Sequence, residues 1–318
     1  AFCDWSSDVC SSDLVTVMKR TCVCAIVGML LLSALAAFPA LAAPKTIGVT
    51  LLTREHQFYR DLEAALVSEA QKFGYKVTVT AGEFDAGRQA AQIDDFISRK
   101  VDALVVAPCD SLAVGSSIAA ANKAGIPVFT VDIANLSTQG KVVAHVASDN
   151  TEGGRQAGML MAKALNGRGK VVIINHPGVT SVLDRVAGFR EVIAKYPGIS
   201  IIADVPAWGQ RDRAMSVMED MLLRVPDIAG VFGINDDSAL GALAAIESAG
   251  KAGKVVIVGY DATPEAKEAI KAGKIYGDAI QYPARIGILA AQAINDYFSG
   301  KAVPALIPVE VGAWTRDN

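Results

Sequence analysis

The sequence predicts an α/β protein built from two doubly wound, Rossmann-like lobes. Three observations lead to this prediction. Apolar, β-rich runs alternate with segments of helical period along the chain after residue 45. Some runs, such as Leu104-Val105-Val106, are continuously apolar, which is typical of strands covered on both faces of a parallel sheet. The strands are too numerous for one small sheet, and open sheets of about ten or more strands tend to split.

The first half of the alternation contains four expected strands. The elements are strand 46–52, helix 58–73, strand 76–81, helix 86–99, strand 103–107, helix 112–124 and strand 127–131. The first and third helices should end at Gly74 and Gly125, because glycine adopts the left-handed conformation of a helix C-cap at little cost. A new strand follows each of these glycines within a few residues.

The alternation restarts after His145-Val146-Ala147-Ser148-Asp149-Asn150. The expected elements are a helix to 165, strand 170–175, a helix to 195, strand 199–205, a helix to 223, strand 230–234, helix 236–249, strand 255–260, helix 264–272, strand 275–280 and helix 283–299. Two similar lobes therefore fit the pattern, and two lobes imply a cleft between them.

The N-terminal segments are excluded from this fold. Residues 1–17 repeat Ser-Ser-Asp and carry acids, and we interpret them as a non-native leader. Residues 18–42 combine two basic residues, a long apolar stretch and small residues at its end, which is the pattern of a secretory signal peptide. The alternative is a membrane anchor, because roughly 18 apolar residues can span a bilayer, but Pro44 discourages continuation of a helix. We expect cleavage after Ala42 or Ala43 and a soluble protein in the periplasm.

Composition limits the partners and the covalent chemistry. The net charge is −3, and no block of Lys and Arg is present, so we expect no nucleic-acid partner. Cys3, Cys10, Cys22 and Cys24 lie in the excluded segments. Only Cys109 is left in the mature chain, which therefore has no intrachain disulfide and depends on its hydrophobic core.

Patterns for enzyme chemistry are missing from the sequence. The turn after the first strand, Thr53 to Gln57, has no glycine for a dinucleotide, and neither a P-loop nor a Gly-x-Ser-x-Gly elbow occurs. His56, His145 and His176 lack the spacing of metal ligands. Cys109 is either a nucleophile beside His56 or a small, partly buried loop residue, and we favour the second interpretation. We expect no catalysis, no cofactor and no metal.

Polar side chains follow several of the predicted strands. They are Asp132, Asn235 with Asp236, Asp261, and Gln281. In open α/β sheets ligands bind beyond the carboxyl ends of the strands, so these side chains should meet at one site. Carboxylates and amides can each hold two neighbouring hydroxyl groups, which suits recognition of a sugar or polyol. The alternative for each residue is a helix cap or a turn.

Aromatic side chains complement this polar set. Phe58 and Tyr59 open the first helix, and Trp208 follows the strand that ends near Val205. Their faces suit the apolar C–H side of a sugar ring. The alternative is that they belong to the core.

The mature chain resembles the ribose-type periplasmic sugar-binding proteins of bacterial ABC transporters. The resemblance lies in these blocks: His145 to Asn150 with Gly153-Gly154, Val231 to Leu243 (VFGINDDSALGAL), Val258 to Pro264 (VGYDATP), and Ile280 to Pro283 (IQYP). It implies a type I periplasmic binding protein fold, in which a hinge of three crossings joins the lobes near Ser148, Gln281 and Glu310. The implied N-terminal lobe is 44–148 plus 282–310, and the C-terminal lobe is 149–281 plus 311–318. Such proteins close around their ligand.

The resemblance also implies a ligand set. Carried over by position, the hydrogen-bonding residues are Asp132, Arg185, Asn235, Asp261 and Gln281, and the ring-stacking aromatics are Phe58 and Tyr59. Arg185 enters only through the resemblance, since by itself it would be interpreted as a helix-surface arginine. The aromatic of the second lobe aligns at Gly209 or, with a shift of one residue, at Trp208, and we select Trp208.

Two residues depart from the ribose-type pattern. Ile133 stands where the family has an arginine, and His56 where it has an asparagine. Loss of the arginine leaves a ligand hydroxyl without its donor, at a cost of about 1–3 kcal/mol. We therefore expect a ligand other than ribose: a different pentose, a hexose, a polyol or a deoxy sugar.

Together these features predict a protein that captures a small sugar or polyol without transforming it. The expected partner is the membrane permease of an ABC transporter. The alternative is a sensory or quorum-type receptor that presents the same closed form to a chemoreceptor or kinase.

Overall fold

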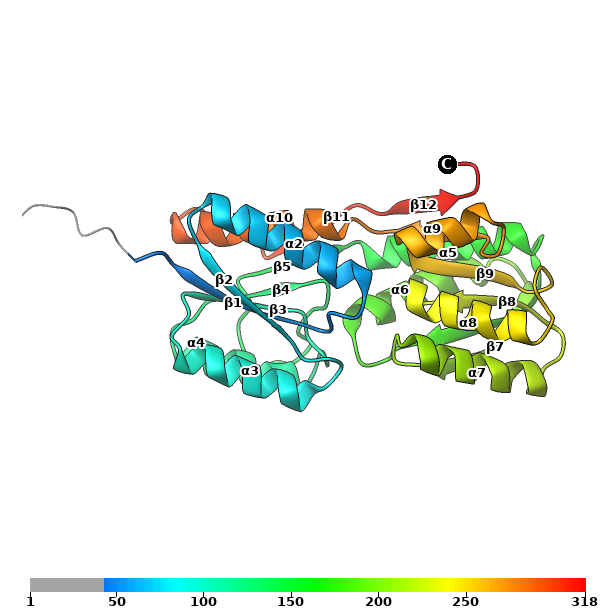
Figure 1. Ribbon diagram of the computed structural model, residues 1–318, viewed down its shortest axis with the longest axis horizontal. Helices are drawn as coiled ribbons and strands as arrows, with labels where there is room; N and C mark the ends of the chain where they lie inside the picture. Colours follow the sequence, from blue (N-terminus) through cyan, green and yellow to red (C-terminus); the bar gives the residue numbers. More distant parts are fainter. Residues whose placement is uncertain (1–42) are drawn as a thin grey trace, which may run out of the picture. The chain divides into compact units, whose positions relative to one another are not determined.

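The computed structural model describes residues 43–318, which carry two six-stranded sheets (Figure 1). The proposed leader, the signal peptide and its cleavage site before Ala43, and four of the cysteines lie outside the described residues. No helix within 43–318 is both long and apolar enough to cross a membrane.

The first sheet is entirely parallel, with the order β11-β5-β4-β3-β1-β2. Its strands are β1 Thr46–Leu51, β2 Lys76–Ala81, β3 Ala103–Val106, β4 Val128–Val131, β5 Ala144–Ser148 and β11 Leu306–Val309. The helices of this lobe are α2 Gln57–Lys72, α3 Ala86–Ser98, α4 Val114–Lys123 and α10 Pro283–Phe298. Helices α2 and α10 cover one face of the sheet, and α3 and α4 cover the other (Figure 1).

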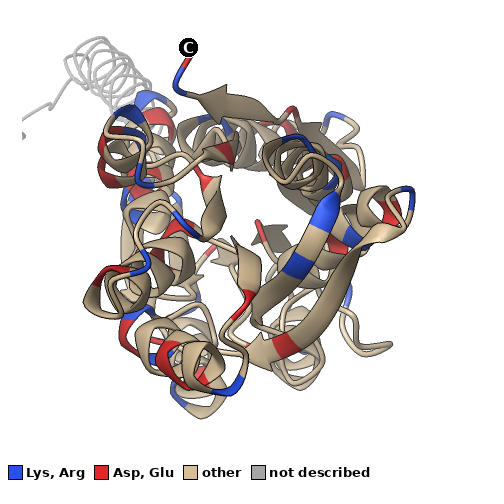
Figure 2. Cartoon of the chain, turned by 90° about the vertical axis from the view of Figure 1, so that its right-hand side faces the viewer, with Lys and Arg blue, Asp and Glu red and all other residues tan. Residues whose placement is uncertain are grey.

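The second sheet has the order β12-β10-β9-β8-β6-β7, and only β12 runs antiparallel to its neighbour. Its strands are β6 Arg168–Asn175, β7 Gly198–Pro206, β8 Ile228–Gly233, β9 Val256–Asp261, β10 Gly277–Ile280 and β12 Gly312–Thr315. The helices of this lobe are α5 Asn150–Ala164, α6 Thr180–Ile193, α7 Arg211–Arg224, α8 Asp236–Ser248 and α9 Pro264–Lys271. Figure 2 shows basic and acidic residues interspersed along its outer helices.

The predicted fold class is confirmed, including the three crossings between sheets. The chain leaves the first sheet after β5, returns after β10 and crosses again after β11. The caps at Gly74 and Gly125 also form: both glycines have positive φ, at 77° and 79°. In each case the following amide bonds back into the helix, Tyr75 to Ala70 and Ile126 to Ala121.

The sequence pattern assigned no strand to β5, and it also did not predict β11 and β12. Strands β11 and β12 each have only four residues, and both are only partly buried, so neither shows the continuous apolar run that marks the central strands. Helix α4 also begins later than expected, at Val114. Asp110 accepts hydrogen bonds from the amides of Leu112 and Ala113 at 2.8 Å each, and this turn holds the preceding residues outside the helix.

Candidate functional site

A cavity lies where the strand ends of the two lobes face each other. The cavity is lined by Leu52, His56, Phe58, Tyr59, Asp132, Ile133, His176, Val179, Ser181, Val182, Arg185, Ile234, Asn235, Asp261 and Gln281. Of the residues predicted from the sequence, all except Asp236 and Trp208 are in this lining.

Asp132 reaches the cavity from the end of β4. It is 4% exposed, and the Tyr59 hydroxyl donates a 2.6 Å hydrogen bond to its Oδ2. Among the described residues its Oδ1 has no hydrogen-bond partner, and the nearest cation is Arg185 Nη2 at 3.8 Å. Burial raises the pKa of Asp132, while Arg185 and Tyr59 oppose that rise. The carboxylate therefore has one occupied oxygen and one that can accept a hydrogen bond from a ligand.

Arg185 lies on α6, and its guanidinium is held on several sides. Nε donates to Asn150 Oδ1 and Nη1 donates to the Ile234 carbonyl, both at 2.9 Å. The guanidinium also lies 4.0 Å from the centre of the Tyr260 ring, a cation–π geometry. These contacts fix its orientation, so that Nη2 points to Asp132 in the other lobe.

Asp261 and Gln281 form a second polar pair at the ends of β9 and β10. Gln281 Nε2 donates to Asp261 Oδ1 at 2.7 Å. Within the described residues Gln281 Oε1 is buried without a partner, so this amide can still accept a hydrogen bond. Burial raises the pKa of Asp261 well above its ordinary value, against the opposing charge of Arg185.

Asn235 has a double role. Its Oδ1 accepts from the Ser238 amide at 2.9 Å, which caps α8, and its Nδ2 donates to the Gly209 carbonyl at 3.1 Å. The helix-cap alternative considered for strand-end residues is therefore true here. An amide still has a second N–H and a second lone pair, so a place in the cavity lining is compatible with the cap.

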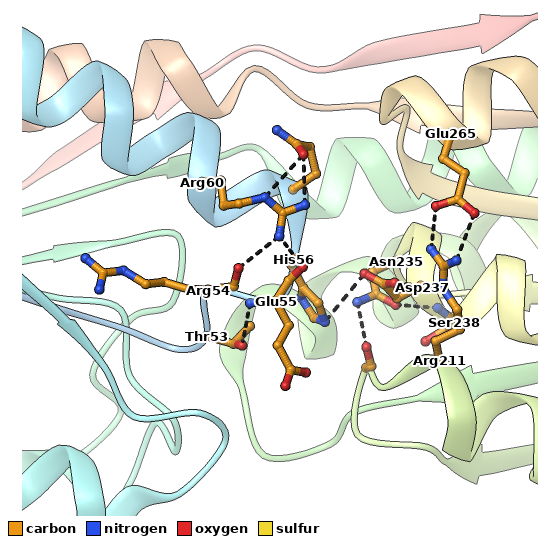
Figure 3. A network of polar contacts seen from close by, with 12 residues as sticks. Thr53, Arg54, Glu55, His56, Arg60, Arg211, Asn235, Asp237, Ser238 and Glu265 are labelled. Atoms are coloured by element: carbon orange, nitrogen blue, oxygen red, sulfur yellow. Dashed lines mark hydrogen bonds and ion pairs between the residues drawn. The ribbon is translucent and has the colours of Figure 1, made fainter.

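Two histidines line the cavity, one from each lobe. His56 Nε2 lies 3.6 Å from Asp237 Oδ2, and Arg211 joins Asp237 to Glu265 (Figure 3). His176 follows β6 and is 6% exposed. Burial lowers the pKa of His56, and it lowers the pKa of His176 to about 4.

His176 was not in the predicted site, although a signal for it existed. It stands directly after an apolar strand, as Asp132 and Asp261 do, and the same strand-end argument applies to it. The aliphatic lining residues, such as Val179 and Val182, were also missed. Nothing in their sequence context distinguishes them from core residues.

The predicted aromatics separate into two groups. Phe58 and Tyr59 line the cavity with their rings perpendicular, 5.1 Å apart between centres. Trp208 lies outside the lining: its side chain is 39% exposed and packs edge-on against His176. Trp208 and Gly209 both have positive φ, and it is Gly209 whose backbone faces Asn235. His176 therefore stands between Trp208 and the cavity.

Cys109, which was considered as a nucleophile, lies outside the cavity lining. Cys109 is buried, its Sγ lies 3.8 Å from the Leu52 carbonyl, and burial raises the pKa of its thiol to about 12. Such a thiol is a poor nucleophile at neutral pH. Within residues 43–318 there is no group of three or more His, Cys, Asp or Glu side chains placed to hold a metal ion.

Comparison with known proteins places the chain in a family. Residues 47–302 match the model of the periplasmic binding protein domain. The ribose import binding protein RbsB of Salmonella typhimurium is 35% identical over 270 residues, 85% of this chain and 90% of that protein. A xylitol-binding protein of Mycolicibacterium smegmatis is 32% identical, over 86% of this chain and 78% of that protein.

Solved structures with the same fold include solute-binding proteins of ABC transporters. A periplasmic solute-binding protein of an ABC transporter from Actinobacillus succinogenes, with bound D-allose, superimposes with a TM-score of 0.80 at 28% identity. The match covers 86% of this chain and 98% of that one. With its two sheets, three crossings and a cavity between the strand ends, this chain belongs to the periplasmic binding protein family of ABC-transporter solute receptors, close to the ribose-type members.

Proposed function

We propose that this protein captures a neutral monosaccharide or polyol in the cavity between its lobes and delivers it to the permease of an ABC importer. The observation that carries the proposal is the pair of buried, unpartnered acceptors, Asp132 Oδ1 and Gln281 Oε1, which both belong to the same cavity. A buried acceptor without a hydrogen bond costs about 1–3 kcal/mol, so a ligand that donates to both is strongly favoured. Vicinal hydroxyl groups are such donors.

Closure follows from the same geometry. We infer that residues 44–148 with 282–310 move as one body, and 149–281 with 311–318 as the other. The contact between Asp132 and Arg185 joins these two bodies inside the cavity. A ligand that binds both side chains therefore stabilises the closed form, and the closed form is what the permease would recognise.

Ile133 and His56 argue against ribose as the ligand. Ile133 is 1% exposed and lines the cavity beside Asp132, where the ribose-type pattern has an arginine. It presents a hydrocarbon surface and no donor. We infer that the ligand places a C–H or methyl group there and turns its hydroxyls toward Asp132, Asp261 and Gln281.

A sensory role is the second candidate. The fructose-binding periplasmic domain of a hybrid two-component system superimposes with a TM-score of 0.81 at 29% identity. The same fold thus serves as a sensor in that protein. For this chain, a chemoreceptor or kinase would be the partner in place of a permease.

The proposed function is tested by melting and calorimetry with a panel of ligands. The chain from Pro44 onward is a compact unit and is the protein to use. The panel contains D-ribose, D-allose, xylitol, D-tagatose and myo-inositol. We expect one or more members other than ribose to raise the melting temperature and bind with a stoichiometry of one. Tight binding of ribose alone would refute the proposed selectivity, and no binding by any neutral sugar or polyol would refute the function.

A further inference from the structure

Away from the hinge, three hydrogen bonds between described residues join the two lobes outside the cavity. They connect the loop after β3 and the segment after β4 with the loop between β6 and α6. The Ser111 amide donates to the Gly178 carbonyl at 3.1 Å, and the Thr180 amide donates to Ser111 Oγ at 3.1 Å. The Ala134 amide donates to Thr180 Oγ1 at 2.8 Å. We call Ser111, Ala134, Gly178 and Thr180 the clasp.

The clasp needs no ligand atom. None of its four residues lines the cavity, and all three bonds run from protein to protein. Ser111 is 2% exposed and Thr180 is 8% exposed, so the bond between them is shielded from water, while Ala134 and Gly178 are partly exposed. They join residues of the first lobe to residues of the second, and opening of the lobes would return every donor and acceptor to solvent.

The clasp also completes the start of α6. Thr180 is the first residue of this helix, and the preceding residue, Val179, has no side-chain oxygen to cap it. The first amides of a helix have no partner within the helix and need an acceptor from outside. Ser111 supplies that acceptor from the opposite lobe, and α6 carries Arg185 into the cavity.

We propose that Thr180 and Ser111 set the balance between the open and closed forms, and through it the affinity for the ligand. This inference rests on the proposed function, because it describes the closure of the same binding site. Apparent affinity scales with the fraction of protein in the binding-competent form, so a residue that touches no ligand can tune it. Thr180 is a positioning residue: it brings the N-terminus of α6 against the first lobe.

The test uses two disruptive variants, a conservative variant and a control. Thr180→Val removes the acceptor for the Ala134 amide with little change in shape, and Ser111→Ala removes the acceptor for the Thr180 amide. Thr180→Ser keeps the hydroxyl. Thr78→Val is the matched control, because Thr78 is exposed on β2, away from the interface.

Two readouts separate closure from folding. The first is the dissociation constant of the best ligand of the panel, by calorimetry. The second is the distance between spin labels in the ligand-free protein, attached to Ser116→Cys on α4 and Ser216→Cys on α7, both exposed positions in opposite lobes. Cys109 is buried and does not compete for the label. The melting temperature of the ligand-free protein serves as the folding control.

We expect Thr180→Val and Ser111→Ala each to raise the dissociation constant about 3- to 10-fold, the effect of losing one hydrogen bond. The ligand-free distance distribution should shift toward the open form, with little change in melting temperature. Thr180→Ser and Thr78→Val should behave like the wild type. If both disruptive variants bind within twofold of wild type and keep its distance distribution, the clasp is refuted. If no sugar binds the wild type, the proposed function fails, and the ligand-free distances alone decide on the clasp: no difference between wild type and variants refutes it.

Discussion

Replacing Asp132 by asparagine changes the charge of this side chain while keeping its shape. Asparagine is the right substitution because Asp132 has a φ of 59°, in the left-handed region. Asparagine and aspartate tolerate this conformation, whereas alanine would add backbone strain to the lost contacts. Any change in ligand affinity can then be assigned to the carboxylate.

The magnitude follows from the contacts of the two carboxylate oxygens. Tyr59 occupies Oδ2, and Oδ1 is the acceptor that faces the cavity. Losing a hydrogen bond to a charged acceptor costs about 1.5–3 kcal/mol, which corresponds to roughly a 10- to 150-fold weaker dissociation constant. Arg185 keeps its bonds to Asn150 and Ile234, so the substitution does not leave that cation without partners.

Melting with and without ligand measures the effect. At a ligand concentration about 100 times the wild-type dissociation constant, binding stabilises the wild type by about 2.7 kcal/mol. A 100-fold weaker variant gains only about 0.4 kcal/mol under the same conditions. The ligand-free melting temperature should stay at or slightly above that of the wild type. Asp94→Asn, at an exposed position on α3, is the control and should keep the full ligand shift. An Asp132→Asn protein with an affinity within threefold of wild type would show that this carboxylate does not bind the ligand.

Four further outcomes follow from individual side chains. Burial raises the pKa of Asp278 to about 7, so the folded state binds a proton more tightly than the unfolded chain does. The free energy of unfolding should therefore fall as the pH rises from about 4 to 7, by at most about 1.4 kcal/mol per pH unit. Asp278→Asn should reduce this pH dependence in urea unfolding at pH 5 and pH 8, and an unchanged slope would contradict the assignment. A Cβ added at Gly154 would lie 2.0 Å from the Arg185 carbonyl oxygen, so Gly154→Ala should destabilise the fold by about 1–3 kcal/mol and weaken ligand binding. Urea unfolding measures the stability and calorimetry measures the binding. A variant as stable as the wild type would rule out this packing. Cys109 should not react with a thiol reagent at pH 8 until the protein is unfolded, and rapid reaction of the native protein would disprove its burial. Trp208→Ala should change the dissociation constant of the ligand by no more than about twofold, as expected for an exposed side chain. A larger loss of affinity in calorimetry would show that Trp208 contributes to ligand binding.

The parts of the site that were predictable are those set by the topology of a parallel sheet. Strands of one sheet that run in one direction end at one edge, so the sequence pattern alone is enough to bring together Asp261 and Gln281, which follow neighbouring strands of the second sheet. Asp132 follows a strand of the first sheet, and it meets them because the strand ends of the two lobes face each other. The same rule applies to His176, which follows β6. It was not predicted because the end of that strand was not among those considered. The fold class was predictable for a similar reason, because buried parallel strands produce continuous apolar runs.

Arg185 could not be found by that rule because it depends on tertiary contacts. It lies inside α6, five residues after the helix begins, and in the sequence it looks like any helical arginine. Its place in the site follows from Asn150, the Ile234 carbonyl and the Tyr260 ring, which come from three other elements. Trp208 differs from the prediction at a finer level: it and Gly209 both have positive φ, and the backbone of Gly209 faces Asn235 while Trp208 lies outside the cavity lining.

The charges around the cavity bear on the class of ligand. Burial raises the pKa of Asp132 and raises that of Asp261 further, while it lowers the pKa of His56 and lowers that of His176 to about 4. Both imidazoles are therefore uncharged at neutral pH, and Arg185 offsets the carboxylate closest to it. A negatively charged ligand would bring its charge into this buried space beside Asp132 and Asp261, where Arg185 already faces Asp132, at a cost of several kcal/mol. A hydroxyl group can donate to a carboxylate and accept from the guanidinium at once. The electrostatics of the lining thus favour a neutral polyhydroxylated ligand over a sugar acid, independently of what the relatives bind.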